Sequence, residues 1–387
     1  MNRKVMSLFF CITLLFLPAI GRFDAKAGST IIKVPENYPT IQAAINQAQP
    51  GDTIQVSSGT YYENLYINKT LTLIGAEKSS TLIVGTGHAN SVVQVNFTTV
   101  SISGFTITNG TYGIMLETCT KSTIKDNNIN GYSDGLWLFH SDNNTITDNL
   151  IFNCGYCGLV LCGHSSSNIV EGNTIRDNNQ GIRLTGVANL IYHNNFVNNS
   201  NQIVIVDSFK NTWNNDFEGN YWSNLLDKDE NQDGIRDVPY VMDGNNQDNY
   251  PLMGVFTQLQ VTKDGQNYSV TIISNSTITN LYFDNSICLD VLELANNNTG
   301  FCRITLLRIF LNSDEKIHIN GLLPIISNEL PTSNSTHVCL YFAYIHPTAM
   351  TVIAPEALVL IGIAVIISVV VAVIVARKVR SGRKYIK

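Results

Sequence analysis

The hydrophobic and polar positions between residues 100 and 211 repeat with a fixed period. A glycine followed by an aliphatic, a variable and a second aliphatic residue occurs four times, and the glycines at 113, 135, 158 and 181 are 22, 23 and 23 residues apart. The four copies are Gly113-Ile114-Met115-Leu116, Gly135-Leu136-Trp137-Leu138, Gly158-Leu159-Val160-Leu161 and Gly181-Ile182-Arg183-Leu184. Periods of this length are typical of stacked structural repeats.

Each repeat contains three short segments in which apolar residues alternate with polar ones, separated by Asn or Gly. Alternation is typical of a β-strand, and three strands in about 22 residues leave no room for a helix or a hairpin. One coil of a solenoid is therefore predicted, with each strand paired to its equivalent in the next coil. The predicted inward rows are Ile102, Ile124, Ile146, Val170, Ile191; Ile107, Ile129, Ile151, Ile175, Phe196; Ile114, Leu136, Leu159, Ile182, Ile203; and Leu116, Leu138, Leu161, Leu184, Ile205.

This pattern resembles the right-handed parallel β-helix of the pectin-lyase-like proteins, and more narrowly the NosD-like proteins with carbohydrate-binding and sugar-hydrolysis (CASH) repeats. The resemblance spans roughly residues 31–253 and is specific for the fold rather than for an activity. It implies an all-β protein with a β-helix over residues 28–253. Residues 40–49 are predicted to be a helix that caps the first coil, with Thr40 as its N-cap.

The repeat ends near Gly254. Residues 254–353 show alternating segments separated by turn residues and no long helical pattern, which predicts a small antiparallel β-sandwich. We interpret it as a spacer between the β-helix and a membrane.

Both ends of the chain carry targeting signals. Residues 1–27 read as a cleaved signal peptide, with an uncleaved anchor as the alternative. Residues 357–376 contain no charge and are long enough to cross a bilayer, and residues 377–387 form a basic tail. The expected product is a single-pass protein of the cell membrane with an extracellular ectodomain and a cytoplasmic C-terminus.

The remaining chain is acidic. Of 24 Lys and Arg and 30 Asp and Glu, the tail holds six positive residues and the signal holds four positive residues and one acid, which leaves 14 positive against 29 acidic residues, or −15. A surface of this charge disfavours nucleic acid and suits neutral glycans or cations. Sequons for N-glycosylation occur at Asn68, Asn96, Asn109, Asn143, Asn198, Asn267, Asn275, Asn297 and Asn334.

An acidic loop follows the regular coils. Its oxygen-bearing side chains alternate along the chain, at Asp227, Asp229, Asn231, Asp233 and Asp237. Calcium prefers six to eight oxygen ligands, so the loop is a candidate calcium site of modest affinity. Tyr240 stands where an EF-hand has its bidentate Glu. A polar loop that binds no metal is the alternative.

Two further groups of side chains could carry chemistry, and each also has a purely structural explanation. Cys154, Cys157, Cys162 and His164 could be a thiolate and imidazole metal site, and the NosD-like resemblance implies copper; inert cysteines or a local disulfide are favoured instead. Asp126 and Asp148 lie one coil apart and could form a carboxylate pair for glycoside cleavage, but turn chemistry before a bend Asn is favoured.

Trp137 and Phe139 are predicted to share the outer face of one strand, flanked by Met115 and Val160, with Arg183 further along. Aromatic faces stack on sugar rings, so these residues are a candidate glycan site; burial beneath a loop or another chain is the alternative. The sequence therefore favours a surface protein that binds an extracellular glycan or has a structural role in the envelope. A polysaccharide-active enzyme and a copper accessory protein are the alternatives.

Overall fold

The computed structural model describes residues 29–87, 91–131, 133–226, 228–263, 265–283, 287–292, 299–310 and 317–345. Within these ranges, no helix is long and apolar enough to cross a membrane. The predicted signal peptide, membrane span and basic tail, at 1–27, 357–376 and 377–387, lie outside the described residues. The membrane anchor therefore stays a prediction.

The chain divides into two compact units, and the division cuts through the last coils of a solenoid. The first unit comprises Met1–Ile169, Ile175–Val187 and Ile203–Asp207, and the second comprises Val170–Thr174, Ala188–Gln202 and Ser208–Lys387.

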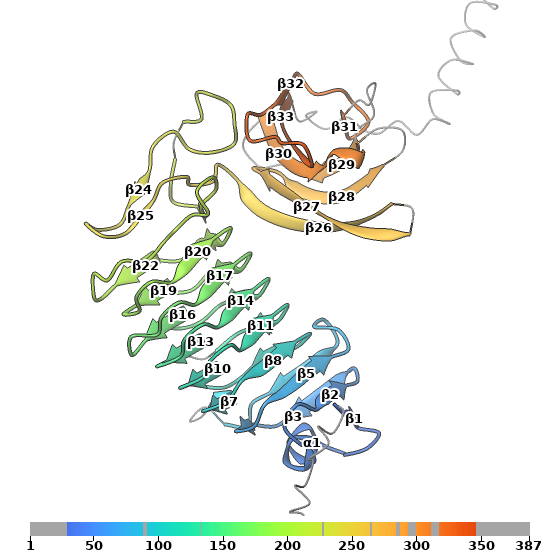
Figure 1. The fold of residues 1–387 in the computed structure, drawn as a ribbon, viewed down its shortest axis with the longest axis vertical. Coiled ribbons are helices and arrows are strands. Elements are labelled where there is room, and N and C mark those ends of the chain that lie inside the picture. The colour runs from blue at the N-terminus through green and yellow to red at the C-terminus, as the bar shows by residue number, and fades with distance from the viewer. Residues whose placement is uncertain are drawn as a thin grey trace, which may run out of the picture. The chain divides into compact units, whose positions relative to one another are not determined.

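Three parallel sheets form the solenoid, and the coils from β2 to β22 each contribute one strand to each sheet. In Figure 1 the strands β2, β5, β8, β11 and β14 lie side by side, one from each successive coil. The first sheet has the order β1 (Ile31–Val34), β2 (Thr53–Val56), β5 (Leu71–Gly75), β8 (Val100–Ser103), β11 (Thr123–Lys125), β14 (Thr145–Thr147), β17 (Ile169–Glu171) and β20 (Leu190–Tyr192). The second has β22 (Asn201–Ile205), β19 (Gln180–Leu184), β16 (Cys157–Cys162), β13 (Asp134–Phe139), β10 (Tyr112–Glu117), β7 (Ser91–Asn96) and β4 (Leu65–Ile67). The third has β23 (Tyr221–Trp222), β21 (Asn195–Val197), β18 (Thr174–Arg176), β15 (Leu150–Phe152), β12 (Asn128–Ile129), β9 (Thr106–Thr108), β6 (Thr81–Val84) and β3 (Gly59–Tyr62).

The predicted inward rows form the core. Eighteen of the twenty side chains are buried, and like residues stack on like residues from coil to coil. Ile203 and Ile205 are only half-buried, because β22 is the last strand of its sheet and no further coil covers them there. The predicted register is otherwise confirmed.

The predicted N-terminal helix is α1 (Ile41–Gln47), slightly shorter than expected. The Thr40 hydroxyl accepts a hydrogen bond from the Ala43 amide at 3.1 Å, as an N-cap does. Glu63 accepts from the amides of Ile41 and Gln42, both at 2.9 Å. The apolar stripe of the helix is buried.

The repeated glycines are required by close packing rather than by turns. A Cβ on Gly113 would lie 2.5 Å from Cγ2 of Ile129 and 2.6 Å from the carbonyl oxygen of Gly135, and Gly135 meets Ile151 and Gly158 in the same way. The ladder skips these positions, pairing Tyr112 with Asp134 and then Ile114 with Leu136. The unpaired glycine position, where a side chain would not fit, accounts for the Gly-aliphatic-x-aliphatic signature.

Buried asparagines hold the bends together. The amide of Phe105 donates to Oδ1 of Asn127 at 3.1 Å, and the amide of Asn127 donates to Oδ1 of Asn149 at 3.1 Å. The Asn149 side chain donates in turn to the carbonyl of Ile124 at 2.8 Å. A ladder of this kind satisfies bend amides that no strand partner reaches. Its further members are Asn173, Asn194 and Asn220, and a parallel ladder contains Asn144, Asn168, Asn189 and Asn211.

The first ladder ends on a buried carboxylate. Asp248, in the short strand β25 (Gln247–Asp248) that pairs with β24 (Tyr240–Val241), accepts from the Asn220 amide at 2.8 Å and from the indole of Trp222 at 3.0 Å. The second ladder ends on Asn246, whose Oδ1 accepts from the Asn211 amide at 3.1 Å. An unpaired end of either ladder would leave buried amides without partners.

The segment after the solenoid forms two stacked sheets around a common apolar core. One has the order β26 (Val255–Lys263), β27 (Gln266–Ser274), β30 (Thr299–Leu307), β33 (His337–Ile345) and β32 (Ile326–Glu329), and the other has β28 (Thr277–Phe283), β29 (Ile287–Leu292) and β31 (Ile317–Ile319). A 3-10 turn, η1, covers Arg308–Phe310. The prediction of an antiparallel sandwich is confirmed except that β29 and β31 pair in parallel.

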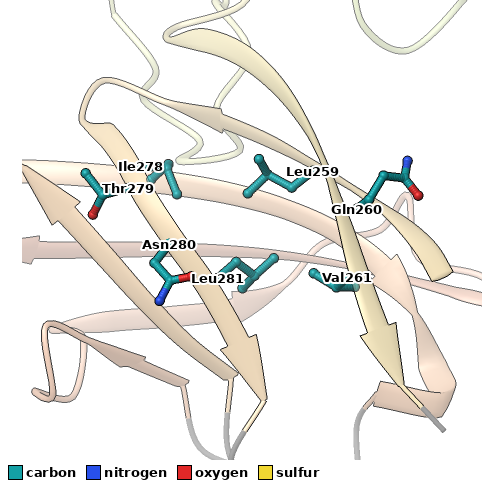
Figure 2. Close-up of a pocket in the computed structure, with 7 residues that line it drawn as sticks. All are labelled: Leu259, Gln260, Val261, Ile278, Thr279, Asn280 and Leu281. Carbon is teal, nitrogen blue, oxygen red and sulfur yellow. The ribbon is translucent and has the colours of Figure 1, made fainter. Parts of the chain in front are cut away.

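A small cavity of about 150 Å³ opens between β26 and β28, as Figure 2 shows. Its lining is Leu259, Gln260, Val261, Ile278, Thr279, Asn280 and Leu281, none of which is charged. Its polar side chains are two amides and one hydroxyl, so it has no charged group for acid–base catalysis.

Asp248 generates a prediction about stability and pH. Burial raises the pKa of its carboxyl from 3.8 to about 6, against the opposing hydrogen bonds from Trp222 and Asn220. The folded state thus holds the proton more tightly than the unfolded chain, so the stability this group contributes is present below about pH 4 and is lost as the pH rises through about 6. The loss is roughly 2–3 kcal/mol of unfolding free energy. Urea unfolding of Asp248→Asn between pH 4 and 7 should lack this decline.

Asp243→Asn is the matched control, because Asp243 precedes Asp248 by five residues and its pKa is shifted in the opposite direction. Burial would raise its pKa, but hydrogen bonds from Asn245 and Asn246 lower it overall. Its contribution is therefore lost as the pH falls. Parallel stability curves for wild type and Asp248→Asn over this range would contradict the assignment.

Candidate functional site

The outer face of the second solenoid sheet brings the predicted glycan-site residues into register. Trp137 pairs with Met115 on one side and Val160 on the other, and Val160 pairs with Arg183. The adjacent outward row pairs Glu117 with Phe139 and Phe139 with Cys162. These strand segments belong to the first compact unit.

Trp137 is half-buried, and the contacts of its ring come from its own sheet. Its indole Nε1 donates to Sγ of Cys162 at 2.6 Å. The ring of Tyr112 meets it edge to face, with the centroids 4.5 Å apart. Beside it, Val160 is buried although it points outward. Trp137 keeps part of its surface exposed, and a glycan site there stays a prediction.

A third outward row lies beside Trp137 and was not predicted. It contains Tyr112, Asp134, Cys157 and Gln180. Simple alternation from Ile114 places Tyr112 in the core, but the irregularity at Gly113 turns the preceding residue outward. The residue before each repeat glycine is the sequence signal that identifies this row.

Asp134 provides a buried carboxyl on this face. It is 4% exposed, its Oδ2 accepts from the Ser133 hydroxyl at 2.8 Å, and its Oδ1 has no hydrogen-bond partner. Burial raises the pKa of Asp134, while the Ser133 hydroxyl and the charge of Arg183 act in the opposite direction. Burial, together with the Asp134 charge, also raises the pKa of Tyr112.

Arg183 and a further aromatic residue lie along the same face. The Arg183 guanidinium carbon is 5.9 Å from the centroid of the Tyr156 ring, and Nη1 donates to the Gln180 side chain at 3.4 Å. Phe139 contacts His140, with ring centroids 4.1 Å apart. The face thus combines stacking surfaces with a guanidinium donor, which are groups that sugar rings and hydroxyls engage, while the Asp134 carboxyl is buried.

Asp126 and Asp148, the candidate carboxylate pair, have the backbone conformation of a bend. Asp126 and Asp148 have φ values of 52° and 56°, and Gly104, Gly172 and His193 at the equivalent places are also left-handed, at 81°, 67° and 57°. Asp and Gly are suited to this conformation. Lys78 also forms an ion pair with Asp126 at 2.5 Å. Turn formation explains why an Asp stands at these two positions.

The cysteine cluster consists of free thiols. All seven cysteines within the described residues are unpaired. Burial raises the pKa of Cys154 to about 12 and raises that of Cys157 further, so both thiols are protonated at neutral pH. Copper and zinc bind the thiolate, so a metal at this cluster would have to displace these protons.

The Asp-rich loop uses its carboxylates internally. Asp229 accepts from the amides of Asp233 and Gly234 at 2.9 and 2.8 Å, and Asp237 accepts from the Glu230 amide at 2.7 Å. Asn231 Oδ1 accepts from the Asp233 amide at 3.1 Å. Asp227 lies outside the described residues.

Across the described part of the chain, no three His, Cys, Asp or Glu side chains are grouped as metal ligands. However, burial raises the pKa of Asp229, and the charges of Asp233 and Asp237 raise it further. A cation would relieve this repulsion, so calcium binding stays a prediction.

A buried ion-pair cluster was not predicted from the sequence. Within the second unit, Glu218 binds Nε2 of His193 at 2.8 Å and Nη2 of Arg303 at 2.8 Å. Arg303 also donates to the carbonyl of Asp233 at 2.7 Å, and the His193 ring stacks on Phe256 at 4.1 Å. Burial alone would raise the pKa of Glu218, but His193 and Arg303 lower it overall. The cluster joins residues far apart in sequence, and we assign it a structural role.

Comparison with known proteins gives a family for the repeats. Residues 45–226 match the family model described as periplasmic copper-binding protein (NosD). The repeats of the solenoid are similar to those of the NosD family. A probable ABC transporter binding protein NosD from Pseudomonas aeruginosa is 34% identical over 137 residues, which cover 35% of this chain and 29% of that protein. A cell surface glycoprotein from Methanothermus fervidus is 33% identical over 181 residues, or 43% of this chain and 30% of that protein.

The NosD-like match therefore spans about three tenths of the length of these relatives. Among solved structures, the alginate lyase from Paenibacillus sp. str. FPU-7 is 15% identical with a TM-score of 0.39, covering 51% of this chain and 82% of that chain. Pectin methylesterase PemA from Erwinia chrysanthemi is 13% identical with a TM-score of 0.34, covering 62% and 84%. These likenesses concern the fold and carry no argument about activity.

The calcium hypothesis has a direct test. If the loop binds calcium, a chelator should lower the melting temperature of the intact protein, and Asp233→Ala should abolish the difference, because it removes one ligand from a site with few to spare. Asp243→Ala, an acid outside the loop, should keep the response. Melting curves of the wild type that ignore both chelator and added calcium would end the calcium interpretation.

Proposed function

We propose that this chain is a cell-surface β-helix protein that binds a neutral glycan on the outer face of its second solenoid sheet and is held at the membrane by residues 357–376. The observation that carries the proposal is the set of Tyr112, Trp137 and Arg183 on one rigid face, with Asp134 buried among them. The surface and periplasmic descriptions of the matching relatives support the location.

The form of this face favours an extended polymer. Its side chains are carried by successive coils about 4.8 Å apart, so the binding surface runs along the stack instead of closing around a small molecule. Tyr112 and Trp137 supply stacking surface, and Arg183 supplies donors to hydroxyl groups.

The charge of the site selects among glycans. Asp134 lies beside the aromatic pair and Glu117 is in the next outward row, where it accepts from Asn96 at 2.9 Å. Two carboxyl groups repel a uronic acid polymer, and the −15 balance of residues 28–376 adds to this repulsion. A neutral or N-acetylated polysaccharide is the ligand class that fits.

Copper handling is the second candidate, since the family description names copper. Cys154 and Cys157 are both buried, so a copper ion would reach that cluster only if the surrounding chain opened. Metal analysis of the purified protein decides this point independently of glycan binding. Catalysis on polysaccharides is less favoured, because a turn explains the position of Asp126 and Asp148.

Replacement of Trp137 tests the proposal. On a glycan array, the intact protein in detergent should retain neutral polymers and not polygalacturonate. Trp137→Ala should weaken that binding by roughly 1–3 kcal/mol, on the scale of aromatic stacking with nucleobases. Both proteins should keep the same melting temperature, because Trp137 is outside the solenoid core.

Tyr62→Ala is the matched control. Tyr62 is an aromatic side chain that is 70% exposed on β3, in a different sheet of the solenoid. Its loss should leave binding unchanged. Equal affinity of wild type and Trp137→Ala for every retained glycan would refute the site.

A further inference from the structure

The turn between β31 and β32 exposes three large aliphatic side chains. Leu322, Leu323 and Ile325 are 56%, 60% and 62% exposed, and Pro324 lies between them. Soluble turns are ordinarily polar, and a run of exposed aliphatic residues marks an interaction surface. No ionisable residue occurs between Ile319 and Asn328, so the attraction of this surface is apolar and not electrostatic.

The turn is held in place by backbone hydrogen bonds. Ile319 and Leu322 exchange bonds at 2.8 and 2.9 Å, and the Asn320 side chain bonds the amide and the carbonyl of Val291 at 2.8 and 3.1 Å. Asn320 and Gly321 adopt left-handed φ values of 48° and 78°. The aliphatic side chains are therefore presented by an ordered turn that loses little conformational entropy when it binds.

The position of the turn identifies its partner. The amide of Ile325 donates to the carbonyl of Ala343 at 2.8 Å, so the exposed side chains lie beside the end of β33 at Ile345. Only residues 346–356 separate that end from the predicted membrane span. Eleven residues reach at most about 40 Å, so this end of the sandwich stays within that distance of the predicted span.

We propose that the 322–325 turn inserts its aliphatic side chains into the interfacial region of the lipid bilayer. The inference rests on the proposed membrane anchor and adds a second contact to it. A single span leaves the ectodomain free to tilt, whereas a second apolar contact restricts its orientation. The lipid partner is a neutral headgroup surface, because the turn carries no charge and the acidic ectodomain is repelled by anionic lipid.

The experiment places a fluorescent reporter on the turn. Leu323→Trp and Ile325→Trp are each made in the full chain, which is reconstituted into phosphatidylcholine vesicles with or without bromine on the acyl chains. Emission of the wild type, with its three native tryptophans, is subtracted. Tyr62→Trp is the matched control, on the solenoid strand β3.

The proposal expects bromine to quench Leu323→Trp and Ile325→Trp and to leave Tyr62→Trp unchanged. Two results would overturn the proposal. In the first, the protein stays in the vesicles through an alkaline wash but bromine does not quench the turn reporters. In the second, the reporters show a blue shift that depends on protein concentration and not on lipid, which would show that a second copy covers the turn. Release of the protein by the alkaline wash would instead refute the anchor, and quenching measured before the wash would still decide the turn.

Discussion

The structure depends on the hydrogen bonds that asparagine side chains make at the bends of the solenoid. Each coil turns sharply, and a turn leaves backbone amides that face neither water nor a neighbouring strand. Asn127, Asn149 and their equivalents fill this gap, since one side chain accepts from the preceding coil and donates to its carbonyls. The apolar rows supply burial energy, but the asparagines fix where each coil bends.

Because the inward rows and the asparagines hold the solenoid together, the residues on its outer faces are free to vary. The inward rows carry the packing, so the outward residues Tyr112, Trp137 and Arg183 are free to differ between coils without loss of the core. Asp126 and Asp148 lie at bends instead, where their left-handed backbone serves the turn. A rigid scaffold with an adjustable surface suits the recognition of an extended ligand.

The sequence predicted those features that repeat. The fixed period determined the inward rows and the pairing of Trp137 with Val160, and the apolar stripe after the Thr40 N-cap predicted the helix. It missed Tyr112 and Asp134, because an irregularity at the repeat glycine interrupts the alternation on which the prediction rested. It missed the Glu218–Arg303 pair, because such a contact between distant segments leaves no periodic signal. The binding role of Trp137 and Phe139 is still a prediction.

Hydrogen exchange at the bends tests the account most directly. In the intact protein, the amides of Phe105, Ser122, Asn127 and Asn194, which donate to asparagine side chains, should exchange as slowly as amides within the neighbouring strands. Their protection should be lost only with global unfolding. Exchange of these amides at the rate of exposed loops, while the strands remain protected, would contradict the claim that the asparagine ladders hold the solenoid together.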